Sequence, residues 1–201
     1  MTRACTTASA PTIIDGGRRA ARHDKDVGVS EEEVILVDAE DRAVGSAGKL
    51  AAHRENLRHR AISVLVFDGE GRMLLQRRAE AKYHSPGLWS NACCTHPRHG
   101  EEPAEAAGRR LREEMGIFLP LAFAGRFAYE APVGEDLWEN EVVHVFTGIH
   151  DGAILPDPDE VGAFGWREVE ALRADIAARG ERYTPWFRLY AAAPWFSGPA
   201  S

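Results

Sequence analysis

The chain has 201 residues, 44% of them hydrophobic, so it can bury a substantial core, and one domain is the default at this length. Its net charge of -7 argues against a nucleic-acid-binding surface, so an anionic ligand has to be met by a local cluster of Arg and Lys. No apolar run approaches the roughly 20 residues that a membrane-spanning helix needs, and we expect no membrane contact.

The cysteines are Cys5, Cys93 and Cys94. Two adjacent cysteines and one near the terminus make a poor disulfide framework, which favours a reducing, cytoplasmic setting. Residues 1–30 are rich in Ala, Thr, Gly and Arg with little periodicity, and we predict a disordered extension there. A transit peptide is the alternative, but the aspartates in this segment count against it.

The first predicted strand is residues 34–38, and residues 39–48 are predicted as a turn-rich loop. Residues 61–67 are almost continuously apolar, which predicts a strand buried on both faces. Residues 68–71 predict a hairpin turn into a strand over residues 73–77.

Two groups of polar residues flank these strands. His53 and His59 lie in a polar stretch, where a single histidine is ordinarily an exposed surface residue. Arg77, Arg78 and Lys82 form a basic cluster in an acidic protein; taken alone, it is ordinarily a solvated loop.

Residues 89–97 place a thiol and an imidazole two residues apart. If this stretch is extended, Cys94 and His96 point to one face and Cys93 to the other. A group that can transfer a proton then lies beside a group that can bind a metal. A helix is predicted to follow, with Pro103 in its first turn and Gly116 just beyond its end.

The second half of the chain predicts strands over residues 122–129 and 139–147, with a loop over residues 130–138 between them. Glu139 and Glu141 occupy alternate positions and face one way. A charge that faces the interior costs on the order of several kcal/mol unless it is paired or metal-bound. Two carboxylates on one face therefore predict a bound cation.

The C-terminal part predicts a loop over residues 151–160, a strand over residues 163–166 and a helix over residues 169–178. Thr184 and Pro185 predict the start of a last helix. An aromatic stripe at helical spacing consists of Tyr183, Trp186, Phe187 and Tyr190. Such a stripe is either core or the wall of a ligand pocket. We expect one domain over residues 31–195 and a frayed tail over residues 196–201.

Part of the central stretch and the helix after it resembles the Nudix box, in which carboxylates bind a divalent metal at a diphosphate. The matching residues are Glu101, Arg109, Glu113, Glu114, Gly116 and Ile117. Thr95 stands where the box begins with glycine, and Arg110 replaces a glutamate. An arginine on the metal-facing side weakens the case for a hydrolase and suggests a phosphate clamp.

The chain from residue 34 to about residue 187 resembles type I isopentenyl-diphosphate delta-isomerase. The matching pieces lie at residues 49–53, 59–61, 77–78, 82, 86–91, 94–97, 139–142 and 184–186. The resemblance implies an α/β (α+β) fold, a Nudix-like α/β/α sandwich around a mixed β-sheet. It also implies interconversion of isopentenyl and dimethylallyl diphosphate in isoprenoid biosynthesis, by a 1,3-allylic proton shift through a carbocation-like intermediate. The expected partner is this small-molecule substrate, and the resemblance leaves monomer and homodimer open.

The resemblance also assigns site residues. It implies a metal site of Mn²⁺, Zn²⁺ or Mg²⁺ at His53, His59, His96, Glu139 and Glu141. It implies Mg²⁺ at the substrate diphosphate, held by Glu114. The diphosphate-binding residues it implies are Lys49, Arg78, Lys82 and Arg110. Cys94 and Glu141 match the proton-transfer pair, with Tyr129 beside the glutamate and Trp186 facing the cation.

Two alternatives remain open. A Nudix hydrolase acting on a nucleoside diphosphate derivative is disfavoured by Arg110 and by the histidine set. A non-catalytic zinc protein that uses the histidines gives no role to Lys49, Arg78 or Lys82, and it predicts an unfolded metal-free protein.

Overall fold

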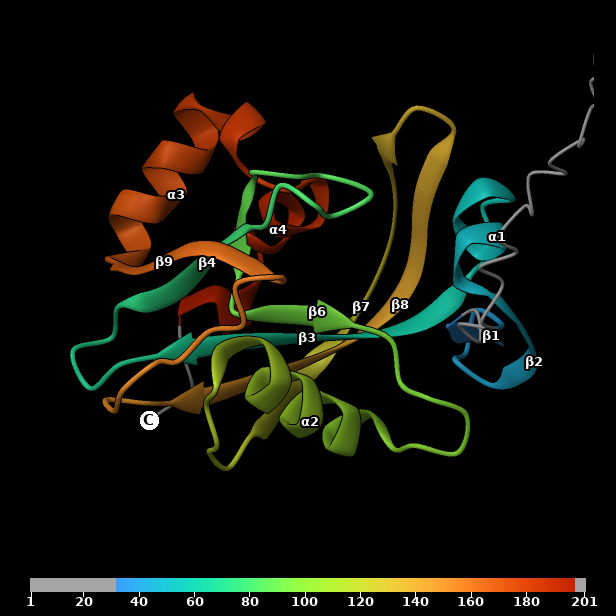
Figure 1. Ribbon diagram of the computed structural model, residues 1–201, viewed down its shortest axis with the longest axis horizontal. Helices are drawn as coiled ribbons and strands as arrows, with labels where there is room; N and C mark the ends of the chain where they lie inside the picture. Colours follow the sequence, from blue (N-terminus) through green and yellow to red (C-terminus); the bar gives the residue numbers. More distant parts are fainter. Residues whose placement is uncertain (1–31, 198–201) are drawn as a thin grey trace, which may run out of the picture. The chain divides into compact units, whose positions relative to one another are not determined.

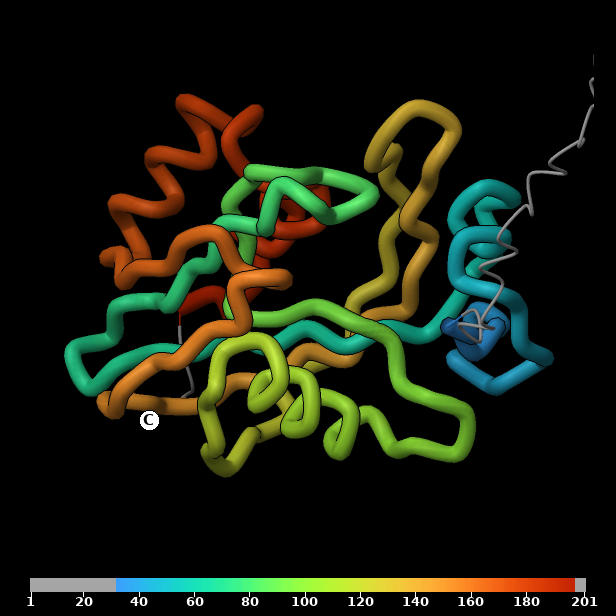
Figure 2. The backbone as a smooth tube through the Cα atoms, viewed as in Figure 1, coloured from blue at the N-terminus to red at the C-terminus, as the bar shows by residue number. Residues whose placement is uncertain are grey.

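A nine-stranded mixed sheet is organised about the central strand β3 (His59–Phe67). Strand β8 (Leu137–Ile149) runs parallel to one edge of β3, and β6 (Cys93–Thr95) runs antiparallel to the other edge. Within residues 32–197, strand β7 (Ala122–Gly134) pairs with β8 alone and is an edge strand. The computed structural model in Figures 1 and 2 describes residues 32–197.

The other strands extend the sheet at both ends of β3. Strands β1 (Glu33–Val37) and β2 (Ala43–Gly48) form an antiparallel pair that meets β3 at its first residue. Strand β4 (Met73–Arg78) pairs antiparallel with β5 (Trp89–Asn91) and with β9 (Val161–Arg167).

Strand β3 is buried on both faces, as its apolar sequence predicts. Ala61, Leu65 and Phe67 enter one core cluster, and the alternating residues Ile62, Val64 and Val66 enter the other. Ser63 is a fully buried polar residue on the face of the first cluster. This polar position lies directly opposite Cys94 of β6.

Helices cover both faces of the sheet, so the predicted mixed sheet between helices is confirmed. Helix α2 (Pro103–Met115) packs on β3 and β6 through the second cluster. Residues of α3 (Val169–Ala178) and α4 (Pro185–Tyr190) enter the first cluster. Figure 1 shows α2 and α4 on opposite sides of β3. The 3-10 helices Gly180–Arg182 and Pro194–Ser197 flank α4.

Helix α2 begins and ends where the sequence predicts. Pro103 occupies the first turn, and the Glu105 side chain accepts a hydrogen bond from the backbone N–H of Glu102 at 3.3 Å. Gly116 ends the helix in the left-handed region with a φ of 66°. A Cβ added at Gly116 would lie 2.5 Å from the carbonyl oxygen of Leu155, so only glycine fits there.

Two predicted loops are wrong because both contain strands. Residues 43–48 of the first loop form β2, an exposed and small-residue strand that lacks the apolar alternation of a half-buried one. In the second loop, residues 130–134 continue β7 and residues 137–138 begin β8. Pro132 and Gly134 lie at an irregularity in the β7–β8 register, and an edge strand tolerates a proline there. Figure 2 shows this hairpin turning back on itself as the yellow tube.

Three smaller features of the fold differ from the predictions. The turn at residues 68–71 forms, but β3 and β4 pair only at Phe67 and Met73 before they diverge. The polar stretch after β2 begins with helix α1 (Lys49–Arg54), which the sequence did not predict. Phe196 is fully buried in the first core cluster, so the predicted fraying does not apply to it. The predictions of a disordered extension over residues 1–30 and of a frayed end at residues 198–201 lie outside the described residues.

Candidate active site

Strand register brings three polar side chains into line across the sheet. Glu141 of β8 lies opposite Tyr129 of β7 on one side and opposite His59 of β3 on the other. The Tyr129 hydroxyl donates a hydrogen bond to Glu141 Oε2 at 2.7 Å. Glu139 precedes Glu141 by two residues and therefore faces the same side, and both glutamates are buried.

The glutamates meet three buried histidines, and we call this group the histidine–glutamate cluster (His53, His59, His96, Glu139 and Glu141). The Nε2 atoms of His59 and His96 are 3.1 Å apart, and His96 Nε2 lies 3.0 Å from Glu141 Oε1. His53 Nε2 lies 3.6 Å from Glu139 Oε2. His53 and His59 are fully buried, so the alternative of exposed surface histidines is wrong.

The cluster fits a divalent cation. Ligand atoms of His53, His59, His96 and Glu139 all lie within 4.8 Å of one another. His53 Nε2 and Glu139 Oε2 are buried and have no hydrogen-bond partner among the described residues. Buried polar atoms without partners are costly, and a cation between them would satisfy both.

Burial favours the neutral form of the titratable side chains in the cluster, which is the ligand form for the histidines but not for Glu139. It lowers the pKa of His53 to about 3 and that of His96 to about 4, so both imidazoles are neutral near pH 7. Burial and the neighbouring charge of Glu141 raise the pKa of Glu139 well above its usual range. Neutral imidazole is the ligand form of histidine, and a cation would favour the ionised form of Glu139.

Two residues of the site, Tyr83 and His84, were missed by the sequence analysis. The Tyr83 hydroxyl lies 2.7 Å from His53 Nδ1, and His84 Nε2 lies 3.4 Å from Glu139 Oε1. His59 Nδ1 is oriented in a similar way, 2.8 Å from the carbonyl oxygen of Leu57. Such contacts hold a ring so that its other nitrogen points at a metal. Tyr83 and His84 follow Lys82 in a loop, and nothing in their spacing signals this role.

The two adjacent cysteines point to opposite faces, as the extended stretch predicts. Cys94 lines the same pocket as His96, Glu139 and Glu141. Cys93 is fully buried beneath α2, with its Sγ 3.8 Å from Glu114 Oε1. Burial raises the pKa of Cys94 to about 12, so Cys94 is a neutral thiol in this structure.

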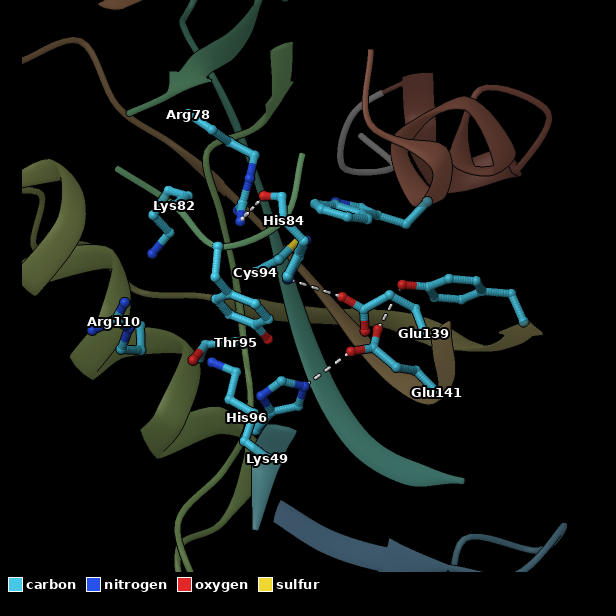
Figure 3. A pocket seen from close by; sticks show the side chains of 13 residues that line it. Lys49, Arg78, Lys82, His84, Cys94, Thr95, His96, Arg110, Glu139 and Glu141 are labelled. Carbon is cyan, nitrogen blue, oxygen red and sulfur yellow. Dashed lines mark hydrogen bonds and ion pairs between the residues drawn. The ribbon is translucent and has the colours of Figure 1, made fainter. Parts of the chain in front are cut away.

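Four cationic side chains line the same pocket: Lys49, Arg78, Lys82 and Arg110. In Figure 3, Lys82 and Arg110 lie on the side away from Glu139 and Glu141, with Cys94 between them. The pocket therefore has a cationic side, a carboxylate side and a thiol between the two.

Three of these cations are paired with acidic side chains. Lys49 Nζ lies 2.9 Å from Glu32, and Lys82 forms an ion pair with Glu160. Arg110 lies 3.2 Å from Glu160. The cavity they line is about 50 Å³, well below the roughly 300 Å³ at which ligand pockets usually begin. Part of the lining must therefore move to admit an organic ligand.

Trp186 is both core and pocket wall. Its side chain is buried in the first core cluster, and its indole faces the pocket. The guanidinium of Arg78 lies 5.4 Å from the centre of the indole. The indole N–H donates a hydrogen bond to Ser90 Oγ at 3.0 Å, which fixes the plane of the ring.

Glu114 lies outside the histidine–glutamate cluster. Its carboxylate accepts hydrogen bonds from Arg110 at 2.8 Å and from Gln76 at 3.1 Å, beside Cys93. Burial raises the pKa of Glu114. The predicted magnesium ligand is therefore next to Arg110, on the cationic side of the pocket.

None of the helices within residues 32–197 has the length and apolar character needed to cross a membrane.

The fold is similar to that of solved Nudix proteins. A protein of Deinococcus radiodurans matches with a TM-score of 0.67 at 22% identity, over 80% of this chain and 97% of that one. The MutT protein from Methanosarcina mazei matches with a TM-score of 0.55 at 19% identity, over 67% of this chain and 90% of that one. At these sequence identities the similarity concerns the fold alone. Together with the family match to residues 57–187, it confirms the predicted Nudix-like sandwich.

The sequence itself matches more specific relatives. The NUDIX domain family matches residues 57–187. Isopentenyl-diphosphate Delta-isomerase 2 of Aromatoleum aromaticum is 52% identical over 156 residues, 78% of this chain and 82% of that protein. Isopentenyl-diphosphate Delta-isomerase of Serratia proteamaculans is 45% identical over 157 residues, 78% of this chain and 88% of that protein. The chain therefore belongs to the isopentenyl-diphosphate delta-isomerase family within the Nudix superfamily.

Proposed function

We propose that the protein interconverts isopentenyl diphosphate and dimethylallyl diphosphate and so serves isoprenoid biosynthesis. The observation that carries the proposal is the joint placement of Cys94 and Glu141 in one pocket whose far side is cationic. A double-bond shift in an organic diphosphate requires two proton-transfer groups and an anchor for the diphosphate, and this pocket offers both.

Cys94 and Glu141 are the proposed proton-transfer pair. One group gives a proton to the terminal alkene carbon, C4, which leaves a tertiary cation at C3. The other removes a proton from C2, the carbon next to the one that bears the diphosphate. The reaction is reversible, so each group gives a proton in one direction and takes one in the other. Tyr129, which donates to Glu141 Oε2, positions that carboxylate.

The histidine–glutamate cluster is the proposed site of Mn²⁺, Zn²⁺ or Mg²⁺, because imidazole and carboxylate ligands suit all three ions. When bound, the ion supplies positive charge that stabilises the ionised carboxylates. Glu139 and Glu141 are then held at fixed positions by their strand and by the histidines opposite them. This rigidity keeps Glu141 oriented towards the substrate.

Lys49, Arg78, Lys82 and Arg110 are the proposed diphosphate-binding residues. A diphosphate carries about three negative charges, and charge-assisted hydrogen bonds to Arg and Lys are the usual means of binding it. Lys82 and Arg110 would exchange their shared partner Glu160 for the substrate. Glu114, beside Arg110, is the proposed ligand of a Mg²⁺ that arrives with the diphosphate.

Trp186 is the proposed stabiliser of the cationic intermediate. An indole face can contribute on the order of 2 kcal/mol to a desolvated cation. The indole does not titrate near neutral pH, so its face carries no acidic proton to exchange with the intermediate. We also propose a cytoplasmic location for the enzyme, and monomer and homodimer both remain compatible with this function.

Nudix hydrolysis is the competing function. It requires a dense acidic cluster to activate water, whereas Arg110 here places a guanidinium 2.8 Å from Glu114. A metal-binding protein without catalysis leaves the cationic side of the pocket without a role.

The test is conversion of isopentenyl diphosphate by the full chain, with and without Mg²⁺, followed by product analysis. We expect dimethylallyl diphosphate to form, and activity to fall sharply when a chelator removes divalent metals. Release of phosphate or pyrophosphate from nucleotide substrates with no isomerisation would contradict the proposal.

A further inference from the structure

The Cys94 thiol belongs to a closed ring of hydrogen bonds, which we call the thiol network (Ser63, Asn91 and Cys94). The Asn91 amide nitrogen lies 2.9 Å from Ser63 Oγ, Ser63 Oγ lies 3.2 Å from Cys94 Sγ, and Cys94 Sγ lies 3.3 Å from Asn91 Oδ1. Ser63 and Asn91 are at most 1% exposed. The proposed function assigns no role to either residue.

Two backbone carbonyls determine the orientation of the Asn91 side chain in the thiol network. The Asn91 amide nitrogen also lies 2.9 Å from the carbonyl oxygens of Val64 and Cys93. Carbonyl oxygens only accept, so the NH₂ group of Asn91 must face them, and a flipped side chain would bring three oxygens together. Asn91 Oδ1 must therefore face Cys94.

The remaining donors follow from this orientation. The two protons of the Asn91 NH₂ group are shared among three acceptors, the two carbonyls and Ser63 Oγ. An amide nitrogen does not accept, so the Ser63 proton cannot point at Asn91 and can point at Cys94 Sγ. The Cys94 S–H then donates to Asn91 Oδ1. All three bonds run in one sense around the ring, an arrangement in which each bond strengthens the next.

The same carboxamide oxygen also reaches the aromatic wall of the pocket. Ser90 Oγ donates to Asn91 Oδ1 at 3.2 Å, and it accepts from the Trp186 indole N–H at 3.0 Å. Thr184 Oγ1 lies 3.1 Å from Ser90 Oγ and, because Ser90 has already used its proton, is the donor there. Thr184 therefore occupies the N-cap position of α4 while its side chain bonds Ser90 instead of the helix.

We propose that Asn91 is a positioning residue for the reaction: its one carboxamide oxygen sets the direction of the Cys94 S–H bond and, through Ser90, the plane of the Trp186 indole. The catalytic consequence of this inference rests on the proposed function. The hydrogen-bond arrangement of the thiol network does not depend on that function. Asn91 thereby couples a proton-transfer group to the ring that faces the developing cation.

The thiol network predicts where the thiol proton resides between turnovers. The S–H bond points at Asn91, and it must rotate towards the pocket before Cys94 can act as an acid. Ser63 continues to donate to the sulfur during that rotation and to the thiolate that remains after transfer. Ser63 thus stabilises the sulfur in both states, and Asn91 determines the starting orientation.

The experiment compares Ser63→Ala, Asn91→Ala and Cys93→Ala by Raman spectroscopy of the S–H stretch and by steady-state kinetics. The band of Cys94 is assigned as the one missing from Cys94→Ala. Ser63→Ala leaves both backbone partners of Asn91 in place, so it remains informative if Asn91→Ala does not fold. Cys93→Ala removes a buried thiol from the same strand but keeps the backbone carbonyl that Asn91 uses, and it is the matched control.

We expect the wild-type Cys94 band at the lower frequency of a hydrogen-bonded thiol, and a shift to higher frequency in Asn91→Ala. Ser63→Ala keeps the acceptor of the S–H bond, so it should shift the band less. We expect kcat to fall about tenfold in Ser63→Ala and further in Asn91→Ala, with KM within about twofold, since one oriented hydrogen bond is lost. Cys93→Ala should change neither the Cys94 band nor kcat.

Either of two results would overturn the inference. One is a wild-type Cys94 band at the frequency of a free thiol. The other is a folded Asn91→Ala protein with an unshifted Cys94 band and unchanged kcat. A wild-type protein that does not isomerise isopentenyl diphosphate would instead refute the proposed function, and the Raman comparison would still decide whether the thiol network exists.

Discussion

At the scale of single residues, burial favours the neutral form of the titratable side chains in the site, so that the thiol keeps its proton and the imidazoles lose theirs. Burial keeps the Cys94 thiol neutral by raising its pKa to about 12, and it keeps His53 and His96 neutral by lowering theirs. Glu139 follows the same rule, because its raised pKa favours the neutral, protonated acid, whose proton a cation must displace. The protonation state of each of these residues is therefore sensitive to a substitution that changes a few atoms around it.

Replacing Cys94 with Ala is expected to lower the turnover of isopentenyl diphosphate by about 10²- to 10⁴-fold, the usual contribution of a general acid or base. KM should change little, because the thiol lies between the cationic side and the carboxylate side of the pocket. Turnover is measured by product formation. Near-normal turnover in a folded Cys94→Ala protein would remove Cys94 from the proton-transfer pair, and Cys93→Ala should remain active.

Metal binding is expected to release protons and to strengthen as pH rises through the raised pKa of Glu139. Since the pKa of Glu139 is raised, the metal-free protein binds a proton there that the metal-bound protein does not. His53 and His96, with pKa values of about 3 and 4, are already neutral near pH 7 and release none. Calorimetric titration with Mn²⁺ or Zn²⁺ in buffers of different ionisation enthalpy measures the protons released.

Glu139→Gln is the control for this measurement, because it keeps the shape of the side chain and removes the titrating proton. We expect weaker binding with fewer protons released. Equal proton release by the variant and the wild type would show that another group titrates.

At the scale of elements, a few turns and pairings determine where the site residues lie. The parallel register of β3 and β8 places His59 beside Glu141, and the antiparallel register of β3 and β6 places Cys94 opposite Ser63. Helix α2 supports this arrangement from the other face and presents Arg110 to the pocket. A one-residue slip of β8 would turn both glutamates away from the histidines.

The end of α2 offers a matched pair of substitutions. Gly116→Ala is expected to lower the free energy of unfolding by about 1–2 kcal/mol or more, because of the left-handed backbone and the contact with Leu155. Gly108→Ala, within the same helix and with nothing within 4 Å of its added Cβ, is expected to raise it by about 0.5–1 kcal/mol. Urea unfolding measures both. Equal effects of the two substitutions would contradict the argument.

At the scale of the whole molecule, an acidic protein that we propose to bind an anionic substrate concentrates cations in one pocket. The net charge is -7, yet Lys49, Arg78, Lys82 and Arg110 line a single cavity. Ion pairs with Glu32 and Glu160 hold Lys49 and Lys82 in place in this structure. We expect substrate to replace these pairs, which are partly exposed and individually weak.

Removal of residues 1–30 is expected to leave kcat and KM within about twofold, because each residue assigned to the site lies in the chain from residue 49 onwards. The comparison is a truncated protein beginning at residue 31 against the full chain, assayed side by side with matched thermal unfolding. A large loss of activity at unchanged stability would assign a catalytic contribution to this segment.

Local patterns in the sequence determined much of the fold and of the site. The strand over residues 61–67, the helix from Pro103 to Met115 and the helix from Val169 to Ala178 follow from apolar periodicity and from proline and glycine at helix ends. The alternation of Glu139 and Glu141 with apolar neighbours indicated a buried cation site. Motif spacing indicated the family, which the comparisons confirm.

Only the tertiary structure decided those features of the fold and the site that depend on contacts between distant segments. Strand β2 lacks alternation, and β7 continues through Pro132, so pairing with a neighbour and not local sequence makes each a strand. Tyr83 and His84 reach the histidine–glutamate cluster from a loop, across a sequence separation that no local pattern encodes. The direction of the Asn91 amide likewise follows from two backbone carbonyls that β3 and β6 bring to it. Periodicity specifies which face a side chain takes, whereas register and hydrogen-bond partners specify what it meets there.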